Sequence, residues 1–182
     1  MRVPEISRTI QVPDAVEVTV EGRNVTARGE KGTLSRDFSY ANLSIESKGK
    51  EITVSAKWPR KKETALVGTV HSHIKNLIIG VQKGFTYKLK IVFSHFPITV
   101  KVQGNTVFIE NFTGERRGRS VKVQGDVKVT VQPEDILVQG TNLEDVSQTA
   151  AKIEQATRVR RKDPRVFLDG LYVFERLEGM EQ

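Results

Sequence analysis

Cationic side chains are concentrated in three short segments of this sequence, and such clusters are suited to binding phosphate. The segments are RVRRKDPR (158–165), GERRGRSVK (114–122) and KWPRKK (57–62). Arginine offers a planar fork of donors that fits a phosphate group, and lysine brings a compact point charge. The whole chain of 182 residues has 29 Lys and Arg against 22 Asp and Glu, a net charge of +7. This balance favours a polyanionic partner, because phosphate contacts release condensed counterions.

The segment 158–165 has the densest charge. It follows a predicted helix, so its cations could simply complement the negative end of the helix dipole. Five cations within eight residues exceed what the dipole needs, so we interpret the segment as a phosphate-binding candidate. Its candidate residues are Arg158, Arg160, Arg161, Lys162 and Arg165.

The other two segments have competing structural explanations. Arg116, Arg117 and Arg119 lie between glycines on a predicted loop or hairpin tip, where they could be merely solvated. The segment 57–62 joins a predicted strand to a predicted helix, and its tryptophan could pack on the core as an edge residue. Cations at a helix N-terminus oppose the dipole, which favours an anion bound there. The candidates in this segment are Lys57, Trp58, Arg60, Lys61 and Lys62.

Residues suited to catalysis or metal binding are sparse. The sequence has no cysteine, and its three histidines are His71, His73 and His95. His71 and His73 point about 200° apart on a predicted helix, so they cannot share a metal. Asp169 precedes Gly170, a pair typical of turns. We therefore expect no enzyme activity, no cofactor or metal, and no small-molecule substrate.

The composition is that of a soluble globular protein, with 37% hydrophobic and 28% charged residues. No apolar run approaches the roughly 18 residues that a membrane span needs, so no membrane partner is expected. The N-terminal sequence lacks the apolar core of a signal peptide. Together with the absence of cysteine, these features favour a cytoplasmic location.

An internal repeat organises the cationic segments. VTVEGRNVTARGEKG (18–32) aligns without gaps on VKVQGNTVFIENFTG (100–114). Each copy alternates apolar and polar residues, turns at a glycine and alternates again, which predicts a hairpin. The expected fold class is α+β, with two tandem duplicated domains, 1–84 and 85–182. Each domain should be an antiparallel β-sheet arrangement packed with one main helix.

The predicted strands are 16–21, 24–29, 33–39, 43–47 and 51–56 in the first domain, and 86–93, 98–103, 106–111, 119–123, 126–132 and 135–139 in the second, followed by a final strand within 166–174. The first helix should cover 61–79 and end at Gly80. The second should open at Thr141, whose spacing to Glu144 is that of a capping box. Glycines between strands, Gly29 among them, are interpreted as turn residues.

Three long stretches carry a resemblance to a known family. They are VEVTVEGRNVTARGEKGTLSRDF, HSHIKNLIIGVQKGFTYKLKIVFSHFPI and IEQATRVRRKDPRVFLDGLYV. The sequence resembles the ribosomal protein L6 family of the large subunit, in its archaeal and eukaryotic branch. The lysine- and glycine-rich terminal motif of the bacterial branch is absent.

The resemblance implies a non-catalytic role in translation, as a structural constituent of the large ribosomal subunit. It implies binding to large-subunit rRNA near the sarcin–ricin loop and the factor-binding region, mainly through the C-terminal domain. The segment 158–165 and the loop with Gly114, Arg116 and Arg117 match the family's contact regions. Implied partners are the rRNA, neighbouring large-subunit proteins and, indirectly, translational GTPases. The alternative is a non-ribosomal tandem protein-interaction module with a solvated basic surface.

Overall fold

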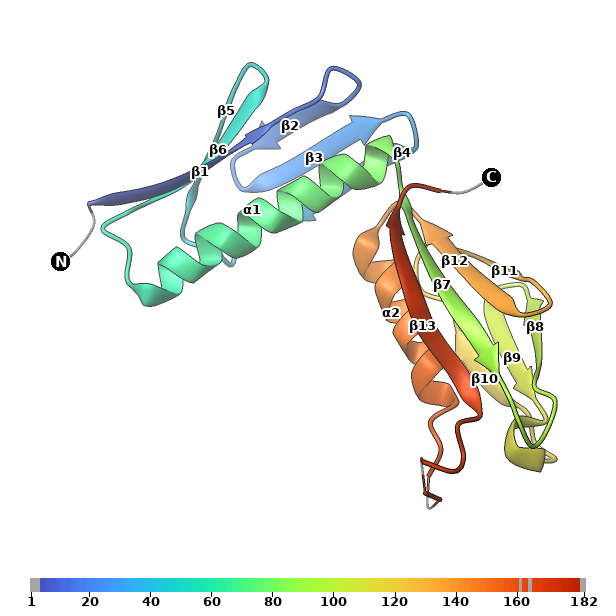
Figure 1. Cartoon of the computed structure of the whole chain (residues 1–182). Helices are drawn as coiled ribbons and strands as arrows, with labels where there is room; N and C mark the ends of the chain where they lie inside the picture. The colour runs from blue at the N-terminus through green and yellow to red at the C-terminus, as the bar shows by residue number, and fades with distance from the viewer. Residues whose placement is uncertain (1–3, 161, 164, 181–182) are drawn as a thin grey trace. The chain divides into compact units, whose positions relative to one another are not determined.

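The structure is a computed structural model that describes residues 4–160, 162–163 and 165–180. The chain divides into two compact units, Met1–Lys83 and Gly84–Gln182, called unit 1 and unit 2 below. Each unit combines antiparallel sheets with one main helix (Figure 1). The predicted α+β class and tandem duplication are confirmed.

Unit 1 has two three-stranded sheets and a long helix. The sheet orders are β1-β6-β5 and β2-β3-β4. The helix α1 (Lys61–Gln82) contacts β1, β3, β4 and β6, so it packs on both sheets. The strands are β1 (Glu5–Gln11), β2 (Glu17–Glu21), β3 (Asn24–Gly29), β4 (Gly32–Asp37), β5 (Ser44–Lys48) and β6 (Glu51–Lys57).

The core of unit 1 follows from the apolar stripe of α1. Val70 and Ile74 are fully buried, in one cluster with Ile52 and Val54 of β6 and Val25 of β3. Apolar residues spaced by three or four positions lie on one side of a helix, which explains this arrangement. Each fully buried side chain of this size contributes about 1.5–3 kcal/mol.

Helix α1 continues beyond the predicted end at Gly80, so that prediction is wrong. It continues because Val81 is fully buried in the core, and Gly84 then takes a φ of +75°. The turn interpretation of Gly29 is also wrong. A Cβ at Gly29 would lie 2.7 Å from the Val81 carbonyl oxygen, to which the Lys31 N–H donates at 2.9 Å. The glycine therefore permits close approach of β3 to the last turn of α1.

Strand β1 is missing from the strands that the sequence predicts. Ile6 and Ile10 share one face of the strand with Arg8 between them, and the arginine interrupts the apolar alternation by which strands are found. Arg8 reaches α1 beside Gly68, where a Cβ would lie 3.6 Å from its Nη1. The contact of Arg8 with α1 thus accommodates the charged residue that interrupts the apolar pattern of β1.

Unit 2 repeats the plan of unit 1 with one additional strand. Its sheet orders are β10-β9-β8 and β11-β12-β7-β13. The helix α2 (Leu143–Ala156) contacts β7, β10, β12 and β13, and the 3-10 turn η1 (Phe112–Gly114) follows β9. The strands are β7 (Phe85–Val92), β8 (Thr99–Gln103), β9 (Thr106–Glu110), β10 (Arg119–Lys122), β11 (Lys128–Val131), β12 (Asp135–Gly140) and β13 (Gly170–Glu178).

Two local predictions for unit 2 are wrong. Helix α2 is capped by Asn142 and not by Thr141: the Asn142 side chain accepts from the Glu144 N–H at 3.1 Å and donates to Asp145 at 2.8 Å. Asparagine is among the preferred N-cap residues. The final strand begins at Gly170 and not near 166, because the preceding residues form the connection described next.

Candidate nucleic-acid interface

Two of the three cationic segments lie at one end of unit 2. The loop 111–118 joins β9 to β10, and the segment 157–169 joins α2 to β13. Figure 1 shows both connections at the end of unit 2 where α2 stops and β13 begins. The fold therefore brings together two clusters that are distant in the sequence.

Arg119 connects the two segments. Its Nε and Nη2 donate to the Glu115 carboxylate at 2.9 and 2.5 Å, and its Nη1 donates to the Ala156 carbonyl at the end of α2. The guanidinium also lies 4.4 Å from the centre of the Phe112 ring. Only 29% of this side chain is exposed. Arg119 begins β10, at the start of the predicted strand 119–123, and its donors are engaged within the protein, so the explanation that it is merely solvated at a hairpin tip is wrong.

The charge of Arg119 has two electrostatic consequences. Its hydrogen bonds hold the pKa of Glu115 below its usual value, and burial acts in the opposite direction. Lys162 adds a smaller attraction in the same direction as Arg119, which links the segment 157–169 to this ion pair. The bond to Ala156 also satisfies one of the carbonyls that a helix leaves unpaired at its C-terminus.

A stack of side chains holds the segment 157–169 against the loop after β7. The Lys162 ammonium lies 4.3 Å from the centre of the Phe167 ring, and that ring stacks on His95 with centroids 4.7 Å apart. The His95 Nδ1 lies 3.2 Å from Oδ2 of Asp169, and Oδ1 accepts from the Ser94 N–H at 2.7 Å. Asp169 is fully buried and lies in no turn, so its interpretation as a turn residue is wrong.

The remaining cations at this end are exposed. In the described part of the chain, the five arginines among them form no ion pair, and the ammonium of Lys162 lies over an aromatic ring. Their charge is therefore available to an anionic partner. Arg161 and Pro164 lie outside the described residues. The exposed cations are Arg116, Arg117, Arg158, Arg160, Lys162 and Arg165, called the basic end of unit 2 below.

Aromatic side chains are exposed beside the basic end, and the sequence analysis did not identify them. Phe93 is 49% exposed and Phe96 is 41% exposed, both in the loop after β7. Gly114, with a φ of +76°, lies against Phe96, and a Cβ there would be 3.3 Å from the ring. Exposed aromatic rings among cations are suited to stacking on unpaired bases. Phe93 was missed because the strand was predicted to include it.

The segment 57–62 lies on unit 1, so the fold does not place it in the basic end. Trp58 is 69% exposed with a φ of +49°, and the expectation that it packs on the core is wrong. The Glu63 carboxylate accepts from the Arg60 N–H at 2.9 Å and places a negative charge at the start of α1. This charge partly offsets the two lysines there. The exposed cations of the segment are Lys57, Arg60, Lys61 and Lys62.

The described residues contain neither a metal-binding cluster nor a membrane-spanning helix. No group of three or more His, Cys, Asp or Glu side chains there is arranged to hold a metal ion. Within 4–160, 162–163 and 165–180, no helix has both the length and the apolar character required to cross a membrane.

Comparison with known proteins identifies relatives along nearly the whole chain. The family model described as "Ribosomal protein L6" matches residues 12–84 and 96–170, so one match covers most of each unit. A protein of Methanosarcina mazei named "Large ribosomal subunit protein uL6" is 49% identical over 174 residues, which is 96% of this chain and 99% of the relative.

Two further relatives carry the same name. The protein of Ignicoccus hospitalis is 51% identical over 172 residues, 92% of each chain. The protein of Desulfurococcus amylolyticus is 46% identical over 182 residues, 98% of this chain and 99% of its own.

Proposed function

The chain belongs to the ribosomal protein L6 family, and from that premise we propose that the basic end of unit 2 binds large-subunit rRNA. Family membership confirms the coarser prediction: this is a structural protein of the large ribosomal subunit, it is not an enzyme, and it acts in the cytoplasmic ribosome. The alternative of a non-ribosomal interaction module is thereby removed. The proposed contact is near the sarcin–ricin loop, at the base of the factor-binding region.

The observation that supports this proposal most strongly is the convergence of two cationic segments at one end of unit 2. The loop 111–118 supplies two exposed arginines and the segment 157–169 supplies four exposed cations. Arg119 donates hydrogen bonds to Glu115 of the loop and to the end of α2, and Asp169 accepts one from the loop after β7, so both connections are held in place. Cations held by an ordered framework lose less conformational entropy on binding than cations on a mobile tail.

The chemistry of the basic end suits folded RNA. Arginine forks match phosphate oxygens, and double-stranded RNA is recognised chiefly by its shape, its phosphates and its 2′-hydroxyls. Phe96 and Phe93 add rings on which an unpaired base can stack. The effect on translational GTPases is indirect: the protein fixes the RNA against which those factors dock.

Incorporation into large subunits tests the proposal. Arg158→Glu combined with Arg160→Glu reverses two exposed charges of the basic end. We expect this variant to bind rRNA at least about 10-fold more weakly and to be incorporated poorly. Lys122→Glu combined with Lys128→Glu makes the same charge change on exposed residues outside the basic end. Lys122 closes the segment 114–122, but it lines a pocket with Asp145 at the start of α2.

The matched pair gives the experiment its control. The Lys122 and Lys128 variant should keep near-normal incorporation, and circular dichroism should show that both variants are folded. Equal incorporation of the two variants would contradict the proposal and favour a protein contact at the basic end.

A further inference from the structure

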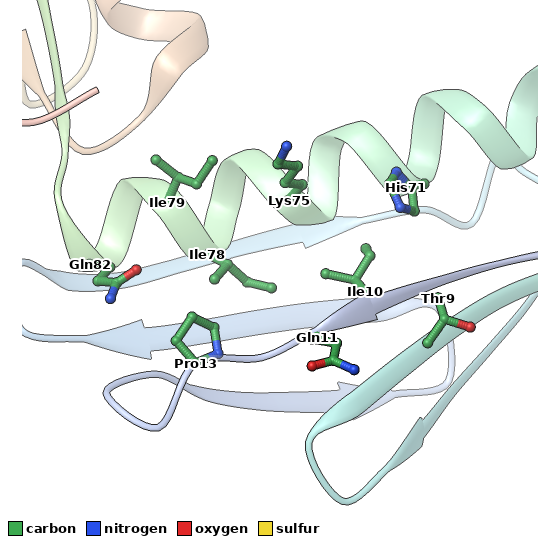
Figure 2. Close-up of a pocket in the computed structure, with 9 residues that line it drawn as sticks. All are labelled: Thr9, Ile10, Gln11, Pro13, His71, Lys75, Ile78, Ile79 and Gln82. Atoms are coloured by element: carbon green, nitrogen blue, oxygen red, sulfur yellow. The ribbon is translucent and has the colours of Figure 1, made fainter. Parts of the chain in front are cut away.

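A groove lies beside the free edge of β1 in unit 1. β1 is the outer strand of the sheet β1-β6-β5, whereas its counterpart β7 is paired with both β12 and β13. No strand corresponding to β13 occurs among residues 4–83. A cavity of about 360 Å³ separates β1 from α1, and Figure 2 shows its lining side chains from both elements. They include Thr9, Ile10 and Gln11 of β1 and Lys75, Ile78 and Ile79 of α1.

The two helices align on their buried residues. The fully buried residues of each helix include three with spacings of three and then four positions, namely Val67, Val70 and Ile74 in α1 and Val146, Thr149 and Ile153 in α2. In this alignment Lys75 matches Glu154 and Ile78 matches Thr157. The groove residues Lys75 and Ile78 are therefore the counterparts of Glu154, near the end of α2, and of Thr157, which follows the helix.

Those counterparts in α2 hold β13. The Thr157 Oγ1 accepts from the Leu171 N–H at 2.9 Å, and the Glu154 carboxylate accepts from the Val173 N–H at 3.4 Å. Leu171 is fully buried. The groove of unit 1 thus lies where unit 2 seats a β-strand between its helix and the edge of its sheet.

β1 offers free backbone groups to such a strand. The Val12 N–H donates to the Lys50 carbonyl at 2.8 Å, which makes that pair a hydrogen-bonded one. Antiparallel partners alternate between hydrogen-bonded and non-hydrogen-bonded pairs, so odd-numbered residues of β1 direct their N–H and C=O groups away from β6. Ser7, Thr9 and Gln11 therefore present donors and acceptors along the open edge.

The edge of β1 lacks the protection that outer strands usually have. Its register with β6 is unbroken from Glu5 to Gln11, a stretch that is described throughout and has no proline. β13, one of the outer strands of unit 2, has a bulge between Val173 and Glu175. Bulges and prolines discourage pairing at sheet edges, so an unbroken edge is a template for another strand.

We propose that β1 pairs with an extended segment of a neighbouring protein of the large ribosomal subunit, seated as β13 is seated in unit 2. The segment runs antiparallel to β1 and inserts alternating apolar side chains, equivalent to Leu171 and Val173, between β1 and α1. An acidic side chain lies opposite Lys75, because a lysine replaces the glutamate of α2 there. An apolar groove beside a ladder of backbone donors and acceptors fits a peptide and not a nucleic acid.

A proline at the edge tests this pairing. Thr9→Pro removes an outward N–H without breaking the β1–β6 ladder, in which this N–H takes no part. Thr9→Ala is the matched control. Each variant carries a benzophenone amino acid in place of Gln11, and photo-crosslinking is performed on purified large subunits that contain the full-length chain.

We expect the Thr9→Ala subunits to give a protein crosslink within one segment that alternates apolar residues, and Thr9→Pro to reduce its yield at least about 10-fold. A crosslink to RNA, to a second copy of this chain or to a helical segment would overturn the proposal, as would an equal yield from both variants.

Two measurements keep the test decisive. If Thr9→Pro does not fold, Ile79→Asp places a charge in the groove at a half-buried position of α1 and should cause the same loss of crosslinking. Amide hydrogen exchange of a Thr9→Ala chain that keeps its Gln11 should show the Gln11 amide protected in the subunit and unprotected in the free chain. The inference rests on the proposed function only in that the chain is part of the large subunit, and it does not depend on rRNA binding by the basic end of unit 2. The affinity of these variants for rRNA should stay normal, which separates failure here from failure of rRNA binding.

Discussion

Arg119 joins the loop 111–118 to the end of α2, and replacing it with alanine measures how far that junction stabilises unit 2. The substitution removes a partly exposed ion pair with Glu115, worth about 0.2–1 kcal/mol. It also removes a charged hydrogen bond to the Ala156 carbonyl, worth about 1.5–3 kcal/mol, and a cation–π contact with Phe112, worth about 0.5–1 kcal/mol. These contributions overlap, so we expect a loss of about 2–4 kcal/mol in the free energy of unfolding of unit 2.

Hydrogen exchange followed by mass spectrometry reports this loss separately for peptides of unit 2. Arg116→Ala is the matched control, because Arg116 is exposed in the same loop and should change the free energy of unfolding by less than about 0.5 kcal/mol. Arg119→Lys keeps the charge but not the planar fork, and should recover less than half of the loss. If Arg119→Ala were as stable as Arg116→Ala, the assignment of Arg119 as the connecting residue would be refuted.

Three further predictions follow from single contacts. Arg119 lowers the pKa of Glu115 in the folded protein, so the ionised carboxylate stabilises the fold at pH values above its usual pKa near 4.5. This stabilisation is lost as the pH falls through the lower pKa of the folded state. Glu115→Gln should therefore make the free energy of unfolding less dependent on pH in this acidic range. Phe96→Ala should lower rRNA affinity about 10-fold by removing base stacking, whereas Phe174→Ala, at 54% exposure on β13, should leave it unchanged in a filter-binding assay. Gly29→Ala places a Cβ 2.7 Å from a carbonyl oxygen of α1, and it should lower the free energy of unfolding of unit 1 by about 1–3 kcal/mol. Denaturant unfolding followed by hydrogen exchange measures this loss. An unchanged stability would exclude the close approach of β3 to α1 as the reason for the glycine.

The elements with clear periodicity could be predicted from the sequence. The two helices and the hairpins alternate or recur at their proper spacing, and their internal duplication is visible in aligned valines and glycines. β1 could not be predicted in this way, because Arg8 lies between its two isoleucines and extends beside Gly68 of a helix far along the chain.

The candidate site was predictable in composition but not in arrangement. The cationic segments are evident in the sequence, yet their convergence depends on tertiary structure. Asp169 precedes a glycine and has the local pattern of a turn, but its partner Ser94 is 75 residues away. Arg119 has the same residue type as its exposed neighbours, and its contacts with Glu115, Phe112 and Ala156 distinguish it from them.

The basic end and the covered edge of β7 both come from one part of unit 2. The segment 157–169 and β13 follow one another in the chain, and residues 4–83 contain no counterpart of either. One extension of the second copy therefore supplies four exposed cations of the basic end and also covers the edge of β7. The first copy retains an open edge at β1, which is the basis for its proposed pairing with a neighbouring protein.

The salt dependence of rRNA binding tests the central claim most directly. For the full chain with large-subunit rRNA of Methanosarcina mazei, six or so phosphate contacts predict a log–log slope of about −4 to −5. Arg158→Gln combined with Arg160→Gln should reduce the slope by about 1.4–1.8 and the affinity at 0.1 M salt by roughly 25- to 60-fold. Lys122→Gln combined with Lys128→Gln should change neither quantity. A salt-insensitive affinity, or the same slope in both double variants, would contradict rRNA binding by the basic end of unit 2.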